Sequence, residues 1–148
     1  MTKLLRRALL VALPAALVAL QLLQPAQAAA LSANDEKAVQ TVVQSQLEAF
    51  AKDDADKAFS YAAPELRKSF GTASVFMAMV KGSYPVVYRP ASVAFLKPES
   101  LGDDAVQRVQ MLDASGTPYL AVYSMQRQKD KTWRISGCVV VENKGRMT

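Results

Sequence analysis

The chain contains 148 residues, no histidine and one cysteine, and its formal net charge is +5. Without histidine it cannot build a Ser-His-Asp or Cys-His nucleophile, a histidine general base or most zinc sites. One cysteine cannot form an internal disulfide, so the stability of the fold has to come from a hydrophobic core.

Residues 1–28 have the three parts of a cleavable secretory signal peptide. A basic start is followed by an apolar run over 8–23, which Pro14 interrupts, and by the small-residue pattern Ala26-Gln27-Ala28. This run is shorter than the roughly 20 apolar residues of a spanning helix. We therefore predict cleavage after Ala28, a periplasmic or secreted bacterial protein without a stable membrane anchor, and a single domain over 29–148. A retained N-terminal anchor is the alternative, and the basic start is compatible with both Sec and twin-arginine export.

The predicted signal peptide accounts for most of the positive charge. It holds three of the 18 basic residues, Lys3, Arg6 and Arg7, and none of the 13 acidic ones, so its removal lowers the formal net charge from +5 to +2. So small a charge affects solubility and is not the footprint of a nucleic-acid-binding surface, which needs a clustered basic patch. We predict no nucleic-acid partner.

The first predicted element of the domain is an amphipathic helix over 35–52. Ser32 and Asn34 are suitable N-caps, and the acidic residues that follow suit a first helical turn. Residues of one helix face then recur at the i, i+3, i+4 spacing. One member of this face, Gln46, is polar. The face consists of Val39, Val42, Val43, Gln46, Leu47 and Phe50.

Three shorter helices are predicted next. The acidic run 53–56 lacks the glycine and the distal glutamate of a calcium loop, so we interpret it as the start of a helix over 54–62 and predict no metal site. Pro64 suits the first turn of a helix that Gly71 ends. A further helix follows a cap at Thr72 or Ser74 and is expected to end at Gly82. Its predicted inward face is Val75, Phe76, Met79 and Val80.

After Pro85 the pattern is typical of strands, and Pro90 suggests an edge or a bulge in the first of them. Helices followed by an antiparallel meander predict an α+β fold, with N-terminal helices packed on a curved four-stranded antiparallel sheet. Helices on one face of such a sheet can enclose a conical cavity. The four predicted strands cover 86–97, 105–113, 118–127 and 132–141.

The acidic side chains give no sign of a catalytic carboxylate. They cluster at predicted helix starts and turns, and none lies in the middle of an apolar strand. The chain also lacks a glycine-rich phosphate loop. We therefore predict no catalytic residues, no metal and no cofactor.

The last predicted strand carries the most specific motif. Its run 133–138, Trp-Arg-Ile-Ser-Gly-Cys, resembles the W-[RK]-I-x-G-C signature of the DUF4864 family. Weaker similarities cover the opening helices at 46–64, a helix-to-strand junction at 76–84 and a central hairpin at 107–123, so the resemblance extends over most of 35–142. It implies the NTF2-like, cystatin-type α+β cone. That superfamily holds both enzymes and non-catalytic binders, so the fold does not decide the function.

Several side chains suit the wall of such a cone. Tyrosine and tryptophan combine a large apolar area with one polar tip, and arginine binds anions, so together they would suit a small apolar or weakly acidic ligand. Ordinary core and sheet packing explains the same residues equally well, and Cys138, in an apolar run, is expected to be a buried hydrophobe. The predicted ligand-binding residues are Tyr84, Tyr88, Arg89, Tyr123, Trp133 and Cys138, with Arg108 as a further candidate.

These features lead to three hypotheses. The leading one is a non-catalytic exported domain that binds a small ligand or a protein partner. The second is an NTF2-like enzyme of isomerase or dehydratase type that uses Tyr or Asp as acid–base groups, which requires a carboxylate inside the cavity. The third is a structural module that forms a homodimer through its sheet.

Overall fold

The computed structural model describes residues 30–145, so the predicted signal peptide and its cleavage site lie outside the described residues. The chain is α+β, as predicted, and its antiparallel sheet has five strands instead of four. Among the described residues, no helix has the length and apolar character that a membrane span requires. The helices are α1 (Ala33–Ala51), α2 (Ala55–Ser60), α3 (Pro64–Phe70), α4 (Ala73–Ser83) and α5 (Pro85–Tyr88). The strands are β1 (Ser92–Phe95), β2 (Glu99–Leu101), β3 (Asp104–Leu112), β4 (Pro118–Arg127) and β5 (Trp133–Glu142).

Helix α1 forms where the sequence predicts it. The Ser32 side chain caps it by accepting a hydrogen bond of 3.1 Å from the backbone N–H of Asp35. Of the six residues in the predicted inward face, five are buried and Val42 is half-buried. The polar member, Gln46, is only 3% exposed. Helix α1 therefore supplies a continuous packing surface with one amide in it.

Two details of α4 differ from the sequence prediction. Thr72 is its N-cap, as expected, and accepts a hydrogen bond of 3.2 Å from the backbone N–H of Val75. Val75 was predicted to face inward, but its side chain is 53% exposed and Met77 is buried instead. The apolar pattern fits two rotations of a short helix, and the packing of Phe76 against three other phenylalanines selects one of them. Gly82 does not end the helix, which continues to Ser83.

The single strand predicted over 86–97 is wrong. Pro85 begins the one-turn helix α5, because its fixed φ and missing N–H suit a first helical turn. Only Ser92–Phe95 of this segment pairs with β3, as the edge strand β1. Pro90 precedes β1, in keeping with its expected place at an edge. The fifth strand, β2, pairs with the other end of β3.

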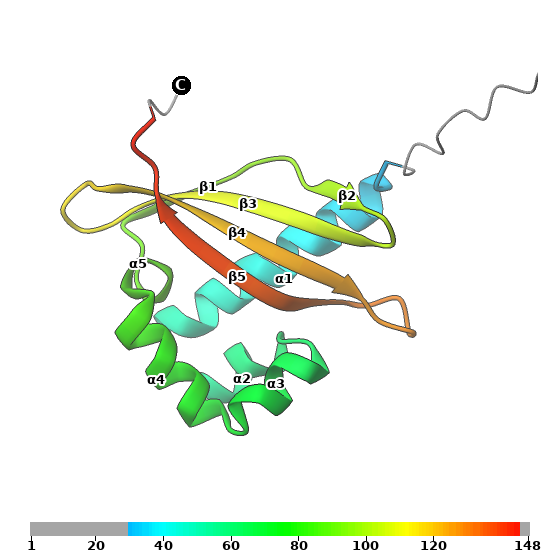
Figure 1. Cartoon of the computed structure of the whole chain (residues 1–148), viewed down its shortest axis with the longest axis horizontal. Helices are drawn as coiled ribbons and strands as arrows, with labels where there is room; N and C mark the ends of the chain where they lie inside the picture. The colour runs from blue at the N-terminus through cyan, green and yellow to red at the C-terminus, as the bar shows by residue number, and fades with distance from the viewer. Residues whose placement is uncertain (1–29, 146–148) are drawn as a thin grey trace, which may run out of the picture.

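The sheet order is β1-β3-β4-β5, and β3, β4 and β5 form its long central part. The β4–β5 register shifts between Ser124, which pairs with Gly137, and Met125, which pairs with Ile135, so β5 contains a β-bulge at this point. Figure 1 shows the helices gathered against one face of the curved sheet, with α1 crossing the strands diagonally and α2, α3 and α4 forming a second group beside β5. The side chains that face this helical layer form the core.

The connection between α2 and α3 attaches the helical layer to the sheet. The backbone N–H of Ile135 donates to the carbonyl of Tyr61 at 2.8 Å, and the N–H of Ala63 donates to the carbonyl of Ile135 at 2.7 Å. These bonds form a short parallel bridge between Ala62 and Ile135 on the free edge of β5. Helix α3 is thus held close to the edge strand.

Candidate functional site

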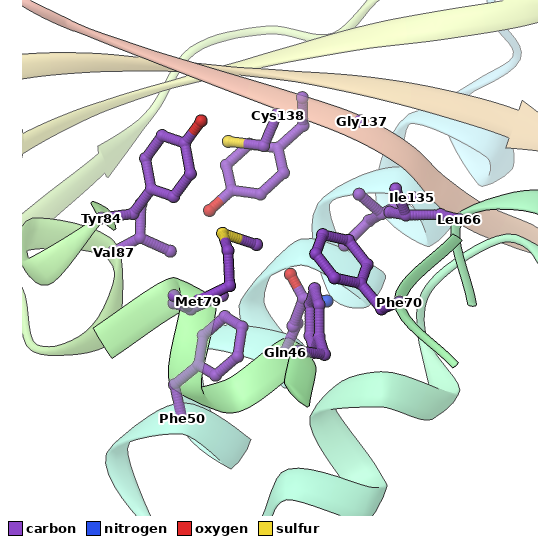
Figure 2. A pocket seen from close by; sticks show the side chains of 13 residues that line it. Gln46, Phe50, Leu66, Phe70, Met79, Tyr84, Val87, Ile135, Gly137 and Cys138 are labelled. Carbon is purple, nitrogen blue, oxygen red and sulfur yellow. The ribbon is translucent and has the colours of Figure 1, made fainter. Parts of the chain in front are cut away.

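A cavity of about 250 Å³ lies between the helices and the concave face of the sheet. Its buried wall is apolar and comes from α1, α4, α5 and β5, so elements from both halves of the chain form it (Figure 2). The apolar residues of this wall are Phe50, Phe76, Val80, Val87 and Ile135.

The opening of the cavity is marked by half-buried side chains. Two of them are on α3, one is on α4, one follows α4 and one is on β5. Because these side chains come from the edge strand β5 and from the helices next to it, the opening lies between that strand and helices α3 and α4. These residues are Leu66, Phe70, Met79, Tyr84 and Cys138.

Two buried polar side chains also line the cavity. Tyr123 is 1% exposed, and its hydroxyl makes no hydrogen bond of normal geometry among the described residues, with only the Cys138 sulfur beside it as a weak acceptor. The Nε2 of Gln46 donates to the carbonyl oxygen of Ala58 at 3.0 Å, which fixes the orientation of the amide because only its nitrogen can donate. Figure 2 shows the Gln46 oxygen directed into the space between Met79 and Phe70. The cavity therefore offers a hydroxyl donor and an amide acceptor in an apolar surrounding.

Tyr123 belongs to a row of three residues across the sheet. Gln107 on β3 pairs with Tyr123 on β4, which pairs with Cys138 on β5. Gln107 is fully buried, and its Nε2 donates to the carbonyls of Leu96 and Arg108, both at 2.7 Å. Gln107 thus binds the backbone of the segment between β1 and β2 and does not line the cavity, whereas Tyr123 and Cys138 do.

Burial keeps Tyr123 and Cys138, two titratable groups of the cavity, protonated at neutral pH. It raises the pKa of Tyr123 well above its ordinary value, and the neighbouring Cys138 adds to that shift. Burial also raises the pKa of the Cys138 thiol to about 12. At neutral pH the phenol is a hydrogen-bond donor and the thiol is uncharged. Cys138 was predicted to be buried, but it is half-buried because it lies at the opening of the cavity.

The residues that line the cavity include no acid and no cation. The carboxylates with shifted pKa values lie elsewhere and are shifted downward, because hydrogen bonds stabilise their charged forms. Within residues 30–145, no three potential metal ligands gather at one place. The cavity can thus form dispersion contacts and hydrogen bonds, and it has no buried base.

Of the six predicted ligand-binding residues, the structure brings three together at the cavity, namely Tyr84, Tyr123 and Cys138. Tyr88 and Arg89 lie outside it. Both bind Asp53: the Tyr88 hydroxyl donates to Oδ1, and Arg89 Nη2 donates to Oδ2 at 3.0 Å.

Asp53 lies at the end of α1 with a positive φ of 54°. Lys81 also binds it at 3.2 Å, and the cations of Lys81 and Arg89 both contact the Tyr88 ring. The hydrogen bond from Tyr88, followed by that from Lys81, holds the pKa of Asp53 below its ordinary value. This exposed cluster joins α1, α4 and α5.

The other two aromatic and basic candidates also lie away from the cavity. Trp133 is 2% exposed and packs at the far end of the sheet, where its Nε1 donates to Asp35. Arg108 was considered as a cavity residue, but it lies on the outer face of β3 and pairs with Glu99 at 2.6 Å. The side chains of Val109 and Met111 are on the other face of β3 and are buried.

Sequence reasoning missed Gln46 as a site residue, together with the phenylalanines of the cavity. A signal for Gln46 was present, because it interrupts an otherwise apolar helix face. A buried amide requires hydrogen-bond partners, and such a position either fixes a backbone group or faces a polar ligand. The nitrogen of Gln46 fixes the backbone carbonyl of Ala58, and its oxygen remains available to a polar ligand.

The outer face of the sheet carries a second apolar surface. Val139 and Val141 on β5 are 61% and 49% exposed. Their register partners on β4 are Val122 and Leu120, both half-buried, so four aliphatic side chains adjoin across two strands. This outer apolar patch has no covering helix in the described part of the chain.

Comparison with known proteins supports the fold. A family model described as "Domain of unknown function (DUF4864)" matches residues 32–148. The structure is similar to the crystal structure of an NTF2-like protein of unknown function from Shewanella baltica OS155, with a TM-score of 0.52 and 12% identity over 78% of this chain and 98% of that chain. An NTF2-like protein of unknown function from Burkholderia xenovorans LB400 is similar at a TM-score of 0.42 and 16% identity, over 68% of this chain and 84% of that one. No curated protein matches the chain. The similarity to the Shewanella baltica structure confirms the predicted NTF2-like fold.

Proposed function

Because the chain belongs to the DUF4864 family, whose function is unknown, we propose a function from its own cavity: it binds a small, uncharged, mostly apolar molecule without changing it chemically. The observation that carries this proposal is the buried hydroxyl of Tyr123, which has no partner among the described residues although it lines an apolar cavity. A buried polar group without a partner costs about 1–3 kcal/mol. A ligand that accepts a hydrogen bond from Tyr123 would recover that cost.

The size and charge of the cavity limit the ligand. Ligand pockets for drug-sized molecules have volumes of roughly 300–1,000 Å³, whereas a cavity of roughly 150 Å³ already admits benzene. At about 250 Å³, this cavity suits a single ring with short substituents. Arg89, the cation expected to bind a weak acid, does not line it, and this favours an uncharged ligand over an acidic one.

Binding without catalysis is favoured over the isomerase or dehydratase alternative. Acid–base chemistry of that type needs a base within hydrogen-bond reach of the substrate. No carboxylate lines the cavity, and burial keeps Tyr123 and Cys138 protonated. Neither group is suited to abstract a proton at neutral pH.

Binding can be tested by NMR titration of the purified protein with toluene, phenol and indole as uncharged probes and benzoate as a charged one. We expect at least one uncharged probe to bind at millimolar concentration, with shift changes at Val80, Val87 and Ile135, and benzoate not to bind. Leu66→Trp, at the opening, should abolish binding. Val75→Trp is the matched control, because Val75 is exposed and does not line the cavity. Shift changes confined to other surfaces would contradict the proposal.

We also propose that the domain is exported. The basic start, apolar run and Ala26-Gln27-Ala28 pattern support export, and the family model begins shortly after this segment, at residue 32. The test is expression of the full chain in a Gram-negative host, followed by fractionation and intact-mass measurement. A periplasmic product that begins at Ala29 is expected. Full-length protein in the membrane fraction would support a retained anchor instead.

A second candidate function, homodimerisation, is favoured by the outer apolar patch. Val139 and Val141 are uncharged, and Arg108 nearby is paired with Glu99, so the outer apolar patch itself presents no unpaired charge to a second copy. Sedimentation of the wild-type protein should then show a dimer at micromolar concentration, and Val139→Lys should convert it to a monomer. A wild-type monomer would exclude this function.

A further inference from the structure

The geometry points to an aromatic alcohol, such as a phenol, as the ligand class of the cavity, with its hydroxyl bound between Tyr123 and Gln46. This inference rests on the proposed binding function. It goes further because it names the chemical group that the cavity recognises.

The two polar side chains of the cavity have complementary roles. The Tyr123 hydroxyl can donate to a ligand oxygen, because no described residue accepts its proton in normal hydrogen-bond geometry and the Cys138 sulfur beside it is only a weak acceptor. The Gln46 nitrogen is used by the Ala58 carbonyl, so the amide end that remains toward the cavity is an acceptor (Figure 2). A hydroxyl is the smallest uncharged group that accepts one hydrogen bond and donates another. A carbonyl or ether oxygen would use Tyr123 only.

The walls favour an aromatic carrier for that hydroxyl. Phe76 packs against Phe50, Phe59 and Phe70, with ring centroids 5.9, 5.4 and 5.3 Å away. Phe50, Phe70 and Phe76 all line the cavity. A ligand ring would extend this cluster in the tilted and edge-on geometries that aromatic pairs prefer. The Met79 thioether at the opening adds a favourable contact for a ring.

Desolvation makes this inference testable. Toluene and phenol have nearly the same shape, but transfer of a hydroxyl into an apolar site is unfavourable unless the site satisfies its hydrogen bonds. A cavity without polar partners would therefore bind toluene more tightly than phenol. A cavity with a donor and an acceptor should bind phenol at least as tightly as toluene.

The experiment is calorimetric titration of the wild-type protein and two variants with toluene, phenol and anisole. For wild type we expect phenol to bind at least as tightly as toluene. Tyr123→Phe should weaken the binding of phenol and of anisole about fivefold, since one hydrogen bond is worth roughly 1 kcal/mol, and leave the affinity for toluene within about threefold of wild type. Gln46→Met should lower the ratio of phenol to toluene affinity without changing that of anisole to toluene. Tyr88→Phe is the matched control and should change nothing, because Tyr88 does not line the cavity.

The affinity ratios remain informative if a variant is less stable, since both probes see the same folded protein. Tighter binding of toluene, with ratios that neither variant changes, would overturn the aromatic-alcohol inference and leave the binding function intact. No binding by any probe would overturn the binding function itself.

Discussion

Trp133 and Asp35 are 98 residues apart in sequence and are joined by a hydrogen bond of 3.1 Å from the indole Nε1 to the carboxylate. Arg127 completes the contact: its Nη2 lies 2.8 Å from the same carboxylate, and its guanidinium lies 4.7 Å from the centre of the Trp133 ring. The first turn of α1 is thus attached to β4 and β5. Trp133 therefore stabilises the packing of α1 against the sheet and does not line the cavity.

Asp35→Asn is expected to alter the acid stability of the protein. The hydrogen bond from Arg127, followed by those from Trp133 and Ser32, holds the pKa of Asp35 below its ordinary 3.8. Since the folded pKa is the lower one, ionised Asp35 favours the folded state above pH 3.8, and this contribution disappears as the pH falls through the folded pKa. The variant should be less stable at pH 7 and lose less stability than wild type on acidification.

Urea denaturation at a series of pH values between about 7 and 2 measures this difference. Glu142→Gln is the control, since Glu142 is exposed and has no ion pair in the described part of the chain. Parallel pH profiles for wild type and Asp35→Asn would contradict the assigned role.

Trp133→Ala is expected to destabilise the protein by about 3–5 kcal/mol, the usual cost of deleting a large buried aromatic side chain. Trp133→Phe should destabilise the protein less, because phenylalanine keeps most of the buried apolar volume. Some destabilisation should remain, because the hydrogen bond to Asp35 is lost. Neither change removes a cavity residue, so Trp133→Phe should leave toluene affinity within about threefold of wild type. A selective loss of toluene binding in a well-folded Trp133→Phe variant would mean that Trp133 contributes to ligand binding.

Cys138 is expected to react slowly with iodoacetamide. Burial raises its pKa from 9.0 to about 12, so the reactive thiolate at pH 8 becomes about a thousandfold scarcer than in the unfolded chain. The greater nucleophilicity of a more basic thiolate offsets part of this loss, so native alkylation should be about thirtyfold to a thousandfold slower than alkylation in urea. Mass spectrometry of timed samples measures both rates. Equal rates would mean that the thiol is accessible and activated.

Lys131→Gly is expected to stabilise the protein by about 0.5–1 kcal/mol. Lys131 has a φ of 71° in the turn between β4 and β5, a conformation that costs a residue with a side chain roughly 1–2 kcal/mol and costs glycine little. Glycine loses part of this gain through the entropy of the unfolded chain. Lys129→Gly in the same turn is the control and should not stabilise, because Lys129 does not have a positive φ. Thermal denaturation of both variants decides the sign.

The sequence predicts the regular elements well where one period dominates. Helix α1 and the three long strands were predicted because their apolar positions repeat over several turns or strand residues. The segment 86–97 was predicted wrongly because β-branched and aromatic residues fit both a strand and the one-turn helix that Pro85 begins. The predicted inward face of α4 was wrong at Val75, because the sequence of this helix fits two apolar faces and only the packing of the phenylalanines selects one of them.

The candidate site was predicted less well for a different reason. Residue type identifies side chains that suit a cavity, and it does not say which of them the fold brings together. Tyr84 and Tyr88 are one helical turn apart, yet one reaches the cavity and the other binds Asp53 on the surface. The sheet register, which the sequence does not encode locally, aligns Tyr123 with Cys138.

The bridge between Ala62 and Ile135 bears on how a ligand enters. Leu66 and Phe70, at the opening, follow this bridge directly on α3, while Ile135 itself forms part of the cavity wall. Any fluctuation that widens the opening by moving α3 outward therefore has to strain or break the two backbone hydrogen bonds of the bridge. The exchange of the Ala63 and Ile135 amide protons with deuterated solvent should then depend on the fraction of molecules in which the opening is widened, and a bound ligand should slow both by the same factor.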